Sequence, residues 1–415
     1  MSAPRIAVLG GGVIGLTTAL TLELSGLSSR IVARERLDRL ASRLAPAARP
    51  PRLASLHAAA SVLPHSVDDP RTAALTAASL PLLAALCRPG GPVRRQLHYE
   101  VFETPPAAPP YLAALPDLES LDDPAVAAAA PRRRGAAALH GWRFRTFFCD
   151  GPRYLVLLAE LYRRAGGRFE ERALERAALP RVGADLLVDC LGAGSVELFG
   201  DPSPPRWLLG RWLRVTAPEA PATRQGGPVS YNYTPTPAVY PVGDPGSAGG
   251  TRAGDVYAYP RADGWILGGT REPVELPPGV AGREAIAPPL PGPTRRVDGL
   301  ELPAAVLDLN MELVRGLTGL DLTGRAVEAG RGLRFTRAAG VRLGTGESGG
   351  RPVVHNTGHG GAGFTLSWGS AATAAVLAAD LLGRPLRPHA PAGEETLAAL
   401  ATALQEALAA GPAAG

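Results

Sequence analysis

The sequence predicts an α/β protein in which a Rossmann-type domain is interrupted by a second domain with a mixed β-sheet. Two observations support this class. A strand, a glycine-rich turn, a helix and a second strand follow one another over residues 5–35, which is the β-α-β unit of such a domain. Further sheet-forming segments lie near residues 140–195 and 340–380, so the strand-rich segments between them form a separate layer.

The first unit begins with an apolar strand at residues 5–9, RIAVL. The glycines of GGGVIG follow, and LTTALTLELSG then has helical spacing and ends at Gly26, a residue suited to a helix C-cap. Residues 29–35, SRIVARE, form the second predicted strand.

The middle of the chain alternates strand and helix patterns with Pro-rich segments. Helices are predicted over residues 72–87, 151–167 and 302–317. Strands are predicted over residues 93–104, 141–150, 168–175, 184–195, 211–219 and 255–270, the last as a hairpin around RADG. Residues 38–70, 105–135 and 272–300 are Pro-rich excursions or loops.

The last unit consists of a strand, RPVVH, a glycine-rich stretch and a helix, SAATAAVLAADLLGR. These elements predict a discontinuous Rossmann-type domain and an inserted second domain. The first comprises residues 1–70, 140–205 and 330–415, and the second comprises residues 71–139 and 206–329.

The composition allows a sizeable core, since 46% of the 415 residues are hydrophobic and 20% are charged. The net charge is +5, but arginines and acidic residues are mixed and no basic stripe interleaves with aromatics, so we expect no nucleic-acid partner. PRRRG, residues 131–135, is interpreted as a charged loop. The chain has no lysine, which excludes a Schiff-base or P-loop lysine. Cys87, Cys149 and Cys190 are too scattered for a disulfide framework or a zinc cluster.

The apolar N-terminus lacks the basic region of a signal peptide, and its glycines interrupt the apolar helix that a signal peptide needs. No apolar run reaches the length of a membrane span, so we expect no membrane association. The chain ends in GPAAG rather than in a peroxisomal tripeptide, which leaves the cytoplasm as the default expectation.

The first candidate site is Gly10-Gly11-Gly12-Val13-Ile14-Gly15, a G-x-G-x-x-G motif between a strand and a helix. Its glycines permit a tight turn and a close approach of the backbone to a pyrophosphate at the helix N-terminus. Glu35 lies about 20 residues further on, where a carboxylate pairs with a ribose hydroxyl. The context therefore predicts a dinucleotide-binding turn.

The second candidate site is VVHNTGHGGAGFTLSWGSA, residues 353–371. His355 and His359 have the spacing of two metal ligands on a helix, but the surrounding glycines make a helix there improbable and disfavour a metal site. We interpret the glycines as backbone that lies against a flat ligand, where a Cβ would collide. A simple glycine-rich turn is the alternative.

Two further patterns are weaker. GESGG, residues 346–350, fits a nucleophile elbow, but the strand RPVVH follows at once, so a loop hairpin is favoured. Arg334 in GRGLRFTR could clamp a carboxylate, with help from a tyrosine hydroxyl. The tyrosines upstream of it are Tyr231, Tyr233, Tyr240, Tyr257 and Tyr259.

Together these segments resemble the D-amino-acid oxidase family of FAD enzymes. VVHNTGHGGAGFTLSWGSA resembles that family's C-terminal signature, H-x-[YW]-G-x-G-G-x-G followed by W-G-x-A. YAYPRADGWILGG resembles its substrate-domain hairpin, GLRFTRAAGVRL its G-[FL]-R-P-x-R segment, and AAASVLPHS its A-A/G-x-x-W-x-P segment. The resemblance runs from residue 5 to residue 382.

The resemblance implies a set of cofactor-binding residues for FAD. Gly10, Gly12 and Gly15, with Val13 and Ile14, would hold the pyrophosphate. The other residues implied are Arg34 and Glu35 near the adenosine, Leu174 at the adenine, Gly192 at the second glycine turn, and Gly360, Gly361 and Thr365 at the isoalloxazine.

The resemblance also implies the substrate contacts. Arg334 and Tyr257 would bind the substrate carboxylate, and the carbonyl of Gly361 would receive the amine. The family's lid tyrosine falls in an insertion, where Tyr231, Tyr233 and Tyr240 are the candidates, and Tyr240 is assigned to the substrate site. No residue is implied as an acid or base catalyst, and no metal is expected.

The chain departs from the family pattern at five positions. Thr357 stands for the aromatic of the C-terminal signature, and Phe335 for the Pro after the clamp Arg. The family's G-R-G-Q strand reads Gly-Arg-Trp-Leu here, with Trp212 at its third position, and Leu63 stands for an early Trp. These departures concern the substrate range more than the fold.

The activity implied by the resemblance is oxidative deamination of D-amino acids, with hydride transfer to the flavin N5 and reoxidation by O₂ to give H₂O₂. One alternative is a related amine oxidase for glycine, sarcosine or D-aspartate, although we assign no residue to the second cation that D-aspartate would need. An NAD-dependent dehydrogenase and a nucleotide-binding protein without catalysis are further alternatives. A homodimer is left open.

Overall fold

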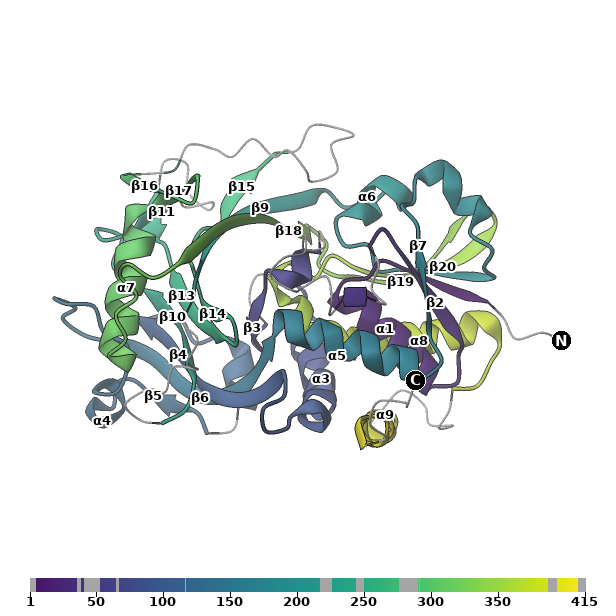
Figure 1. Ribbon diagram of the computed structural model, residues 1–415, viewed down its shortest axis with the longest axis horizontal. Helices are drawn as coiled ribbons and strands as arrows, with labels where there is room; N and C mark the ends of the chain where they lie inside the picture. Colours follow the sequence, from purple (N-terminus) through teal and green to yellow (C-terminus); the bar gives the residue numbers. More distant parts are fainter. Residues whose placement is uncertain are drawn as a thin grey trace.

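The computed structural model has two parts, each built around its own large sheet (Figure 1). It describes residues 5–35, 39–40, 53–64, 67–115, 117–216, 226–243, 250–275, 290, 292–386 and 394–409. The end of the AAASVLPHS segment and the final residues of the chain lie outside the described residues.

The first part contains a six-stranded sheet in the order β19-β20-β8-β1-β2-β7. Its strands are β1 (Ile6–Leu9), β2 (Ser29–Ala33), β7 (Arg168–Glu171), β8 (Leu186–Asp189), β19 (Arg342–Ser348) and β20 (Arg351–Thr357). The strands from β20 to β7 are parallel, and β19 pairs with β20 antiparallel. Both β1 and β8 are buried along their whole length, and they are apolar apart from Asp189 at the end of β8. The predicted Rossmann-type sheet is confirmed.

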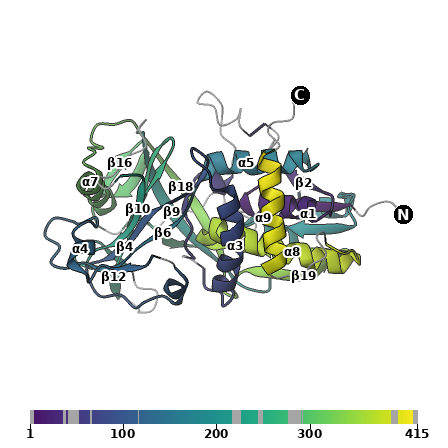
Figure 2. The same cartoon turned by 90° about the horizontal axis from the view of Figure 1, so that it is seen from below.

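Helices cover both faces of this sheet. They are α1 (Val13–Leu24), α3 (Thr72–Leu86), α5 (Gly151–Arg164), α6 (Gly194–Phe199), α8 (Gly363–Leu382) and α9 (Glu394–Ala409). Helix α1 packs against α8 and α5, and Figure 2 shows α3 lying beside α9. Within the described residues, one stretch, Gly360–Leu382, is long and apolar enough to cross a membrane. Since 72% of that apolar window is buried inside the protein, it is the core helix of this part.

The second part is a mixed sheet in the order β15-β9-β14-β13-β10-β4-β6-β3, with β18 on β9 and β5 on β6. Its strands are β3 (Ala59–Ser61), β4 (Val93–Phe102), β5 (Glu119–Ser120), β6 (His140–Asp150), β9 (Pro205–Val215), β10 (Val229–Thr234), β13 (Val256–Arg261), β14 (Gly264–Gly268), β15 (Glu272–Val274) and β18 (Val327–Arg337). Helix α7 (Ala304–Thr318) covers one face, where Trp265 and Leu267 join its apolar cluster. Ile266 points the other way and packs with Ala59 and Phe148, toward the first part.

The remaining elements are short. They are η2 (Ala54–Leu56), η3 (Pro110–Ala114), η4 (Arg176–Arg181), η5 (Gly360–Ala362), α4 (Pro124–Ala127), the ribbon of β11 (Pro241–Gly243) with β12 (Thr251–Ala253), and the ribbon of β16 (Thr294–Val297) with β17 (Leu300–Pro303).

Most predicted elements are confirmed, and the differences have physical reasons. Strand β18 is absent from the sequence prediction because VEAGRGLRFTR lacks alternating apolar residues, yet all of it pairs with β9. The prediction of loop throughout residues 272–300 is wrong, since β15 and β16 lie there. Helix α8 begins at Gly363, seven residues before the predicted start, because core packing outweighs the low helix propensity of glycine.

The predicted domain boundaries stay a prediction, and four segments lie across them. One is β18, whose residues 330–337 were assigned to the Rossmann-type domain but pair with β9 of the mixed sheet. Strands β3 and β6, assigned to the Rossmann-type domain, belong to the mixed sheet. Helix α3, assigned to the second domain, packs against α8 and α9.

Candidate active site

The first glycine turn, between β1 and α1, has no room for a side chain at two of its glycines. Gly10 has φ +110°, and a Cβ there would lie 2.5 Å from the carbonyl oxygen of Cys190. A Cβ on Gly15 would overlap the carbonyl oxygen of Gly10, so α1 packs directly on the turn. The N-terminal amides of α1, beginning at Val13, therefore stand at the carboxyl edge of the parallel sheet, where a pyrophosphate binds.

The residues predicted for the adenosine half of the cofactor lie at or near the carboxyl edge of this sheet. The Val13 amide donates a hydrogen bond to Ser55 Oγ at 3.1 Å, which places η2 at the helix N-terminus. Arg34 and Glu35 follow β2 at the same edge of the sheet. Leu174 packs in the apolar cluster on the sheet face that contains Val32.

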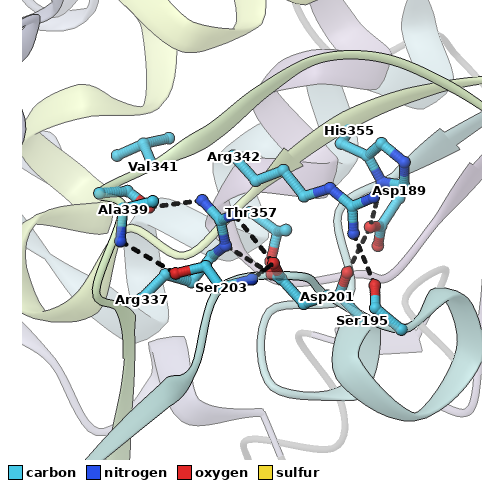
Figure 3. Close-up of polar contacts among 12 residues, drawn as sticks. Asp189, Ser195, Asp201, Ser203, Arg337, Ala339, Val341, Arg342, His355 and Thr357 are labelled. Carbon is cyan, nitrogen blue, oxygen red and sulfur yellow. Dashed lines mark hydrogen bonds and ion pairs between the residues drawn. The ribbon is translucent and has the colours of Figure 1, made fainter.

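A second glycine turn follows β8 and is tied to β20 (Figure 3). Gly192 has φ +57°, and its carbonyl oxygen accepts a hydrogen bond from Thr357 Oγ1 at 3.1 Å. The Thr357 hydroxyl thus joins the two carboxyl strand ends. Asp189, at the end of β8, accepts hydrogen bonds from Ser195 Oγ at 2.5 Å and from His355 Nδ1 at 2.9 Å.

Both histidines of the C-terminal stretch are buried and partnered. His355 is hydrogen-bonded to Asp189, and His359 Nε2 lies 3.2 Å from Ser370 Oγ. Burial lowers the pKa of His359 to about 3, so this ring is neutral at physiological pH. Within the described part of the chain, no group of three or more His, Cys, Asp or Glu side chains is placed to hold a metal ion. The histidines stabilise the turn.

The C-terminal glycine turn lies against the end of β18. Thr336 of β18 forms a β-bridge with His359, which brings the turn to within a few residues of Arg334. Gly360 has φ +56° and Gly361 is exposed. Thr365 is buried, and its hydroxyl both donates to the carbonyl of Leu63 at 2.8 Å and accepts from its amide at 3.0 Å. These bonds join α8 to the segment after β3.

An ion pair ties the end of β18 to the segment between α6 and β9 (Figure 3). Arg337 donates hydrogen bonds to Asp201 at 2.5 and 2.9 Å and to the Gly340 carbonyl at 2.8 Å. Burial alone would raise the pKa of Asp201, but the hydrogen bonds from Arg337 and the Ser203 amide, together with the charges of Arg337 and Arg342, lower that pKa. The strand end that carries Arg334 is therefore held firmly.

Arg334 and Tyr257 lie on the face of the mixed sheet that turns toward the first part, each across a glycine of a neighbouring strand. A Cβ on Gly210 of β9 would overlap the Arg334 guanidinium, and a Cβ on Gly268 of β14 would overlap the Tyr257 hydroxyl. Arg334 Nη1 also donates to the Thr270 carbonyl at 3.3 Å. Gly268 of β14 pairs with Trp212 of β9, two residues after Gly210. The Tyr257 hydroxyl and the Arg334 guanidinium are therefore diagonal neighbours on one face of the sheet. We refer to Arg334 and Tyr257 over these two glycines as the clamp.

The other tyrosines considered for the substrate site lie on the opposite face. Tyr231, Tyr233 and Tyr240 are buried in the apolar cluster with α7. The Tyr240 hydroxyl donates to the Gly269 carbonyl at 3.0 Å, and Tyr231 donates to Asn310 Oδ1 at 3.0 Å. The structure thus brings Tyr257, Arg334 and the Gly361 turn toward one region and leaves Tyr240 out of it.

Two further residues lie near the clamp: Tyr259, which the sequence indicated only as one of five upstream tyrosines, and Arg271, which sequence reasoning missed. Tyr259 stacks on Tyr257, with ring centroids 4.9 Å apart, and donates to Asn232 Oδ1 at 2.6 Å. Arg271 forms an ion pair with Asp255, which raises the pKa of Arg271, and Tyr257 and Tyr259 act on it in the same direction. The available signal was positional, since Arg271 follows the β14 strand that carries Gly268.

A separate cleft of about 980 Å³ lies on the α7 side of the mixed sheet. Its lining includes Arg132, Arg133 and Arg134 of the PRRRG segment together with Met311 and Arg315 of α7. Arg133 is paired with Glu103 at 2.8 Å. The cleft is not part of the clamp region.

Comparisons with known proteins agree on one family. Residues 5–377 match the family described as "DAO: FAD dependent oxidoreductase". The D-amino-acid oxidase of Rubrobacter xylanophilus is 32% identical over 91% of this chain and 97% of that protein. The D-aspartate oxidase of Homo sapiens is 26% identical over 92% of this chain and 96% of that protein. The glycine oxidase of Geobacillus kaustophilus superposes with a TM-score of 0.57, at 17% identity, over 92% of this chain and 95% of that one, a likeness of fold.

Proposed function

Since the chain belongs to the DAO family of FAD-dependent oxidoreductases, we propose that it oxidises D-amino acids to 2-oxo acids, ammonia and H₂O₂. The main support for this proposal is the clamp, in which the side chains of Arg334 and Tyr257 pack over glycines on one face of the mixed sheet. A guanidinium and a phenol placed in this way suit a carboxylate. The amino acids named by the curated relatives share that group.

The cofactor of this family is FAD, and the glycine turns fit it. Gly10 and Gly15 leave no room for a Cβ, so backbone alone faces the site of the pyrophosphate. Gly12 and the amides of Val13 and Ile14 would complete that contact. We further propose that the remaining sequence-derived assignments hold: Arg34, Glu35 and Leu174 at the adenosine, Gly192 along the cofactor, and Gly360, Gly361 and Thr365 at the isoalloxazine.

In the proposed reaction the chain orients the substrate. Arg334 donates two parallel hydrogen bonds to the carboxylate, Tyr257 donates one more, and the carbonyl of Gly361 accepts one from the neutral amine. These three contacts fix the direction of the Cα–H bond. Bound FAD supplies the hydride acceptor and, on reoxidation by O₂, the route to H₂O₂. No protein base at carbon is required, which agrees with the structural roles of His355 and His359.

Arg271 favours D-aspartate as a second candidate substrate. It supplies a second cation next to Tyr257 and Tyr259, the feature that an acidic side chain would need. However, Asp255 forms an ion pair with Arg271 and compensates its charge. We therefore expect neutral D-amino acids to be preferred, and Asp255→Asn to shift the ratio of kcat/KM toward D-aspartate. The family match over residues 5–377 argues against the alternative of an NAD-dependent dehydrogenase, because such an enzyme shares only the first glycine motif.

The proposal is tested by the colour of the purified protein. It should be yellow, and the flavin absorbance should bleach anaerobically with D-alanine and return with air, whereas L-alanine should leave it unchanged. D-aspartate, glycine and sarcosine are measured in parallel to separate the amine oxidases of this fold. A yellow protein that none of these compounds reduces would refute the amino-acid oxidase activity.

A further inference from the structure

A row of polar side chains crosses the mixed sheet next to the clamp, on the neighbouring strands β13, β10 and β4 (Figure 1). Tyr257 of β13 is paired directly with Asn232 of β10, and Asn232 is paired with Glu100 of β4. Because paired residues share a face of a sheet, Asn232 and Glu100 lie on the clamp face. Tyr259 lies on the same face, since it follows Tyr257 by two residues.

These side chains are hydrogen-bonded in a fixed order. Asn232 Nδ2 donates to Glu100 Oε1 at 2.6 Å, and Asn232 Oδ1 accepts from the Tyr259 hydroxyl at 2.6 Å. His98 Nε2 lies 2.8 Å from the same Glu100 oxygen, and His98 Nδ1 lies 2.8 Å from Ser230 Oγ. An ionised carboxylate can only accept hydrogen bonds, so Glu100 binds the donor end of the Asn232 amide and leaves the amide oxygen for Tyr259.

The row is shielded from water, which strengthens its hydrogen bonds. Glu100, Asn232 and His98 are buried. Burial, followed by the charge of Glu100, raises the pKa of Tyr259 well above its usual value, so the Tyr259 hydroxyl stays protonated and donates. Hydrogen bonds in such surroundings are electrostatically stronger than hydrogen bonds in water. The position of the Tyr259 hydroxyl is therefore well defined.

The bond to Asn232 brings the Tyr259 ring against Tyr257. Because Asn232 stands opposite Tyr257, a hydrogen bond from Tyr259 to Asn232 draws the Tyr259 ring diagonally toward Tyr257. The two rings are stacked, with centroids 4.9 Å apart and an interplanar angle of 17°. The Tyr257 hydroxyl has no hydrogen-bond partner within the described part of the chain. Its direction is therefore set by packing, which includes Gly268 beneath the ring and Tyr259 beside it.

We propose that Tyr259 is a positioning residue of the clamp, which acts on the substrate carboxylate through the Tyr257 hydroxyl and is itself held by Asn232 and Glu100. The inference rests on the proposed function, because it gives Tyr257 the task of binding a carboxylate. A shift of the Tyr259 ring would let the Tyr257 ring turn. The hydrogen bond from Tyr257 to the carboxylate would then weaken, because hydrogen bonds lose strength steeply as their angle departs from linear.

The test is a double-mutant cycle on carboxylate binding without turnover. Propanoate carries the carboxylate but no amine, and its dissociation constant is measured by calorimetry on the FAD-loaded protein. Tyr259→Phe keeps the ring and removes the hydroxyl that Asn232 holds. We expect the dissociation constant to rise about 3- to 10-fold in this variant. In a Tyr257→Phe background, Tyr259→Phe should leave it within about twofold, because the hydroxyl through which Tyr259 acts is already gone.

Tyr231 provides the matched control. Its hydroxyl also donates to an asparagine, Asn310 Oδ1, at 3.0 Å, but on the α7 face of the same sheet. Tyr231→Phe should leave propanoate binding within about twofold of the wild type. Equal affinity in the wild type and Tyr259→Phe would overturn the proposal. The same loss with and without the Tyr257 hydroxyl, or an equal loss in Tyr231→Phe, would overturn it as well.

The cycle also separates this inference from the proposed function. If Tyr259→Phe weakens propanoate binding only in the presence of the Tyr257 hydroxyl, the positioning role stands. Failure of every D-amino acid to reduce the flavin in the same preparation would then count against the proposed function alone.

Discussion

The placement of Arg334 depends on the absence of one side chain, which makes Gly210→Ala a direct perturbation of the clamp. In the structure a Cβ at residue 210 would lie 2.9 Å from Arg334 Cζ and closer still to Nη1. Ordinary contacts between such atoms are about 3.5–4.0 Å, so the guanidinium must move by roughly 1 Å. The guanidinium is the flexible end of its side chain, so we expect it to swing away while the sheet persists.

A displacement of that size at a substrate-positioning group lowers the rate about 100-fold, which is about 2.7 kcal/mol of transition-state stabilisation. We expect kcat/KM for D-alanine, measured by oxygen consumption, to fall by this factor in Gly210→Ala. The midpoint of thermal unfolding should change little, because replacing glycine in an unstrained strand changes the free energy of unfolding by only about 0.4–1 kcal/mol.

Gly344→Ala is the matched control for this substitution. Gly344 is also a strand glycine, in β19, and a Cβ there would meet no atom within 4 Å. It should behave as the wild type in both assays. A folded Gly210→Ala protein with kcat/KM within about threefold of the wild type would show that Arg334 is not the carboxylate ligand.

Three further outcomes are expected. Tyr257→Phe should raise the dissociation constant for propanoate about 10-fold or more by removing one hydrogen bond to a charged group, and calorimetry with an unchanged constant would exclude that bond. Gly10→Ala should yield protein without flavin absorbance, since its φ of +110° and the 2.5 Å approach to the Cys190 carbonyl admit no side chain, whereas Gly344→Ala should remain yellow. The pKa of His359 is about 3 in the folded protein, against 6.5 in the unfolded chain. The unfolded chain therefore gains this proton first as the pH falls. Between pH 6.5 and pH 3, the free energy of unfolding should drop by about 1.4 kcal/mol per pH unit. His359→Asn should flatten this slope in urea titrations at pH 5 and pH 7, and an unaltered slope would contradict the assignment.

The glycine turns could be predicted from the sequence because their constraints are local. Gly10 and Gly15 need no distant information, since a strand, a tight turn and a helix within one β-α-β unit already require residues without a Cβ. Arg334 and Tyr257 were identified through the family resemblance, because residue type alone does not single out one arginine or one tyrosine in this chain. Nothing in the sequence indicated that Gly210 and Gly268 lie beneath these two side chains.

The faces of the strands could not be predicted in the same way. Alternation along a strand shows which residues share a face, but not which face meets α7 and which meets the first part. Tyr257 and Tyr240 were therefore both expected at the substrate site, Tyr257 at the carboxylate and Tyr240 as a candidate for the lid tyrosine. In the structure Tyr240 donates to the Gly269 carbonyl beneath α7, whereas Tyr257 stacks with Tyr259 on the other side.

The sequence by itself determined the Rossmann-type unit and the two glycine turns, because short-range periodicity and backbone freedom encode them. Only the tertiary structure decided that Trp212 lies over Gly330 and that Arg271 lies beside Tyr257. Trp212 and Gly330 are more than 100 residues apart, and their contact depends on the register of β9 with β18. That register follows from burial of one sheet face against α7 and of the other against the first part. Neither contact can be predicted from a local segment of the sequence.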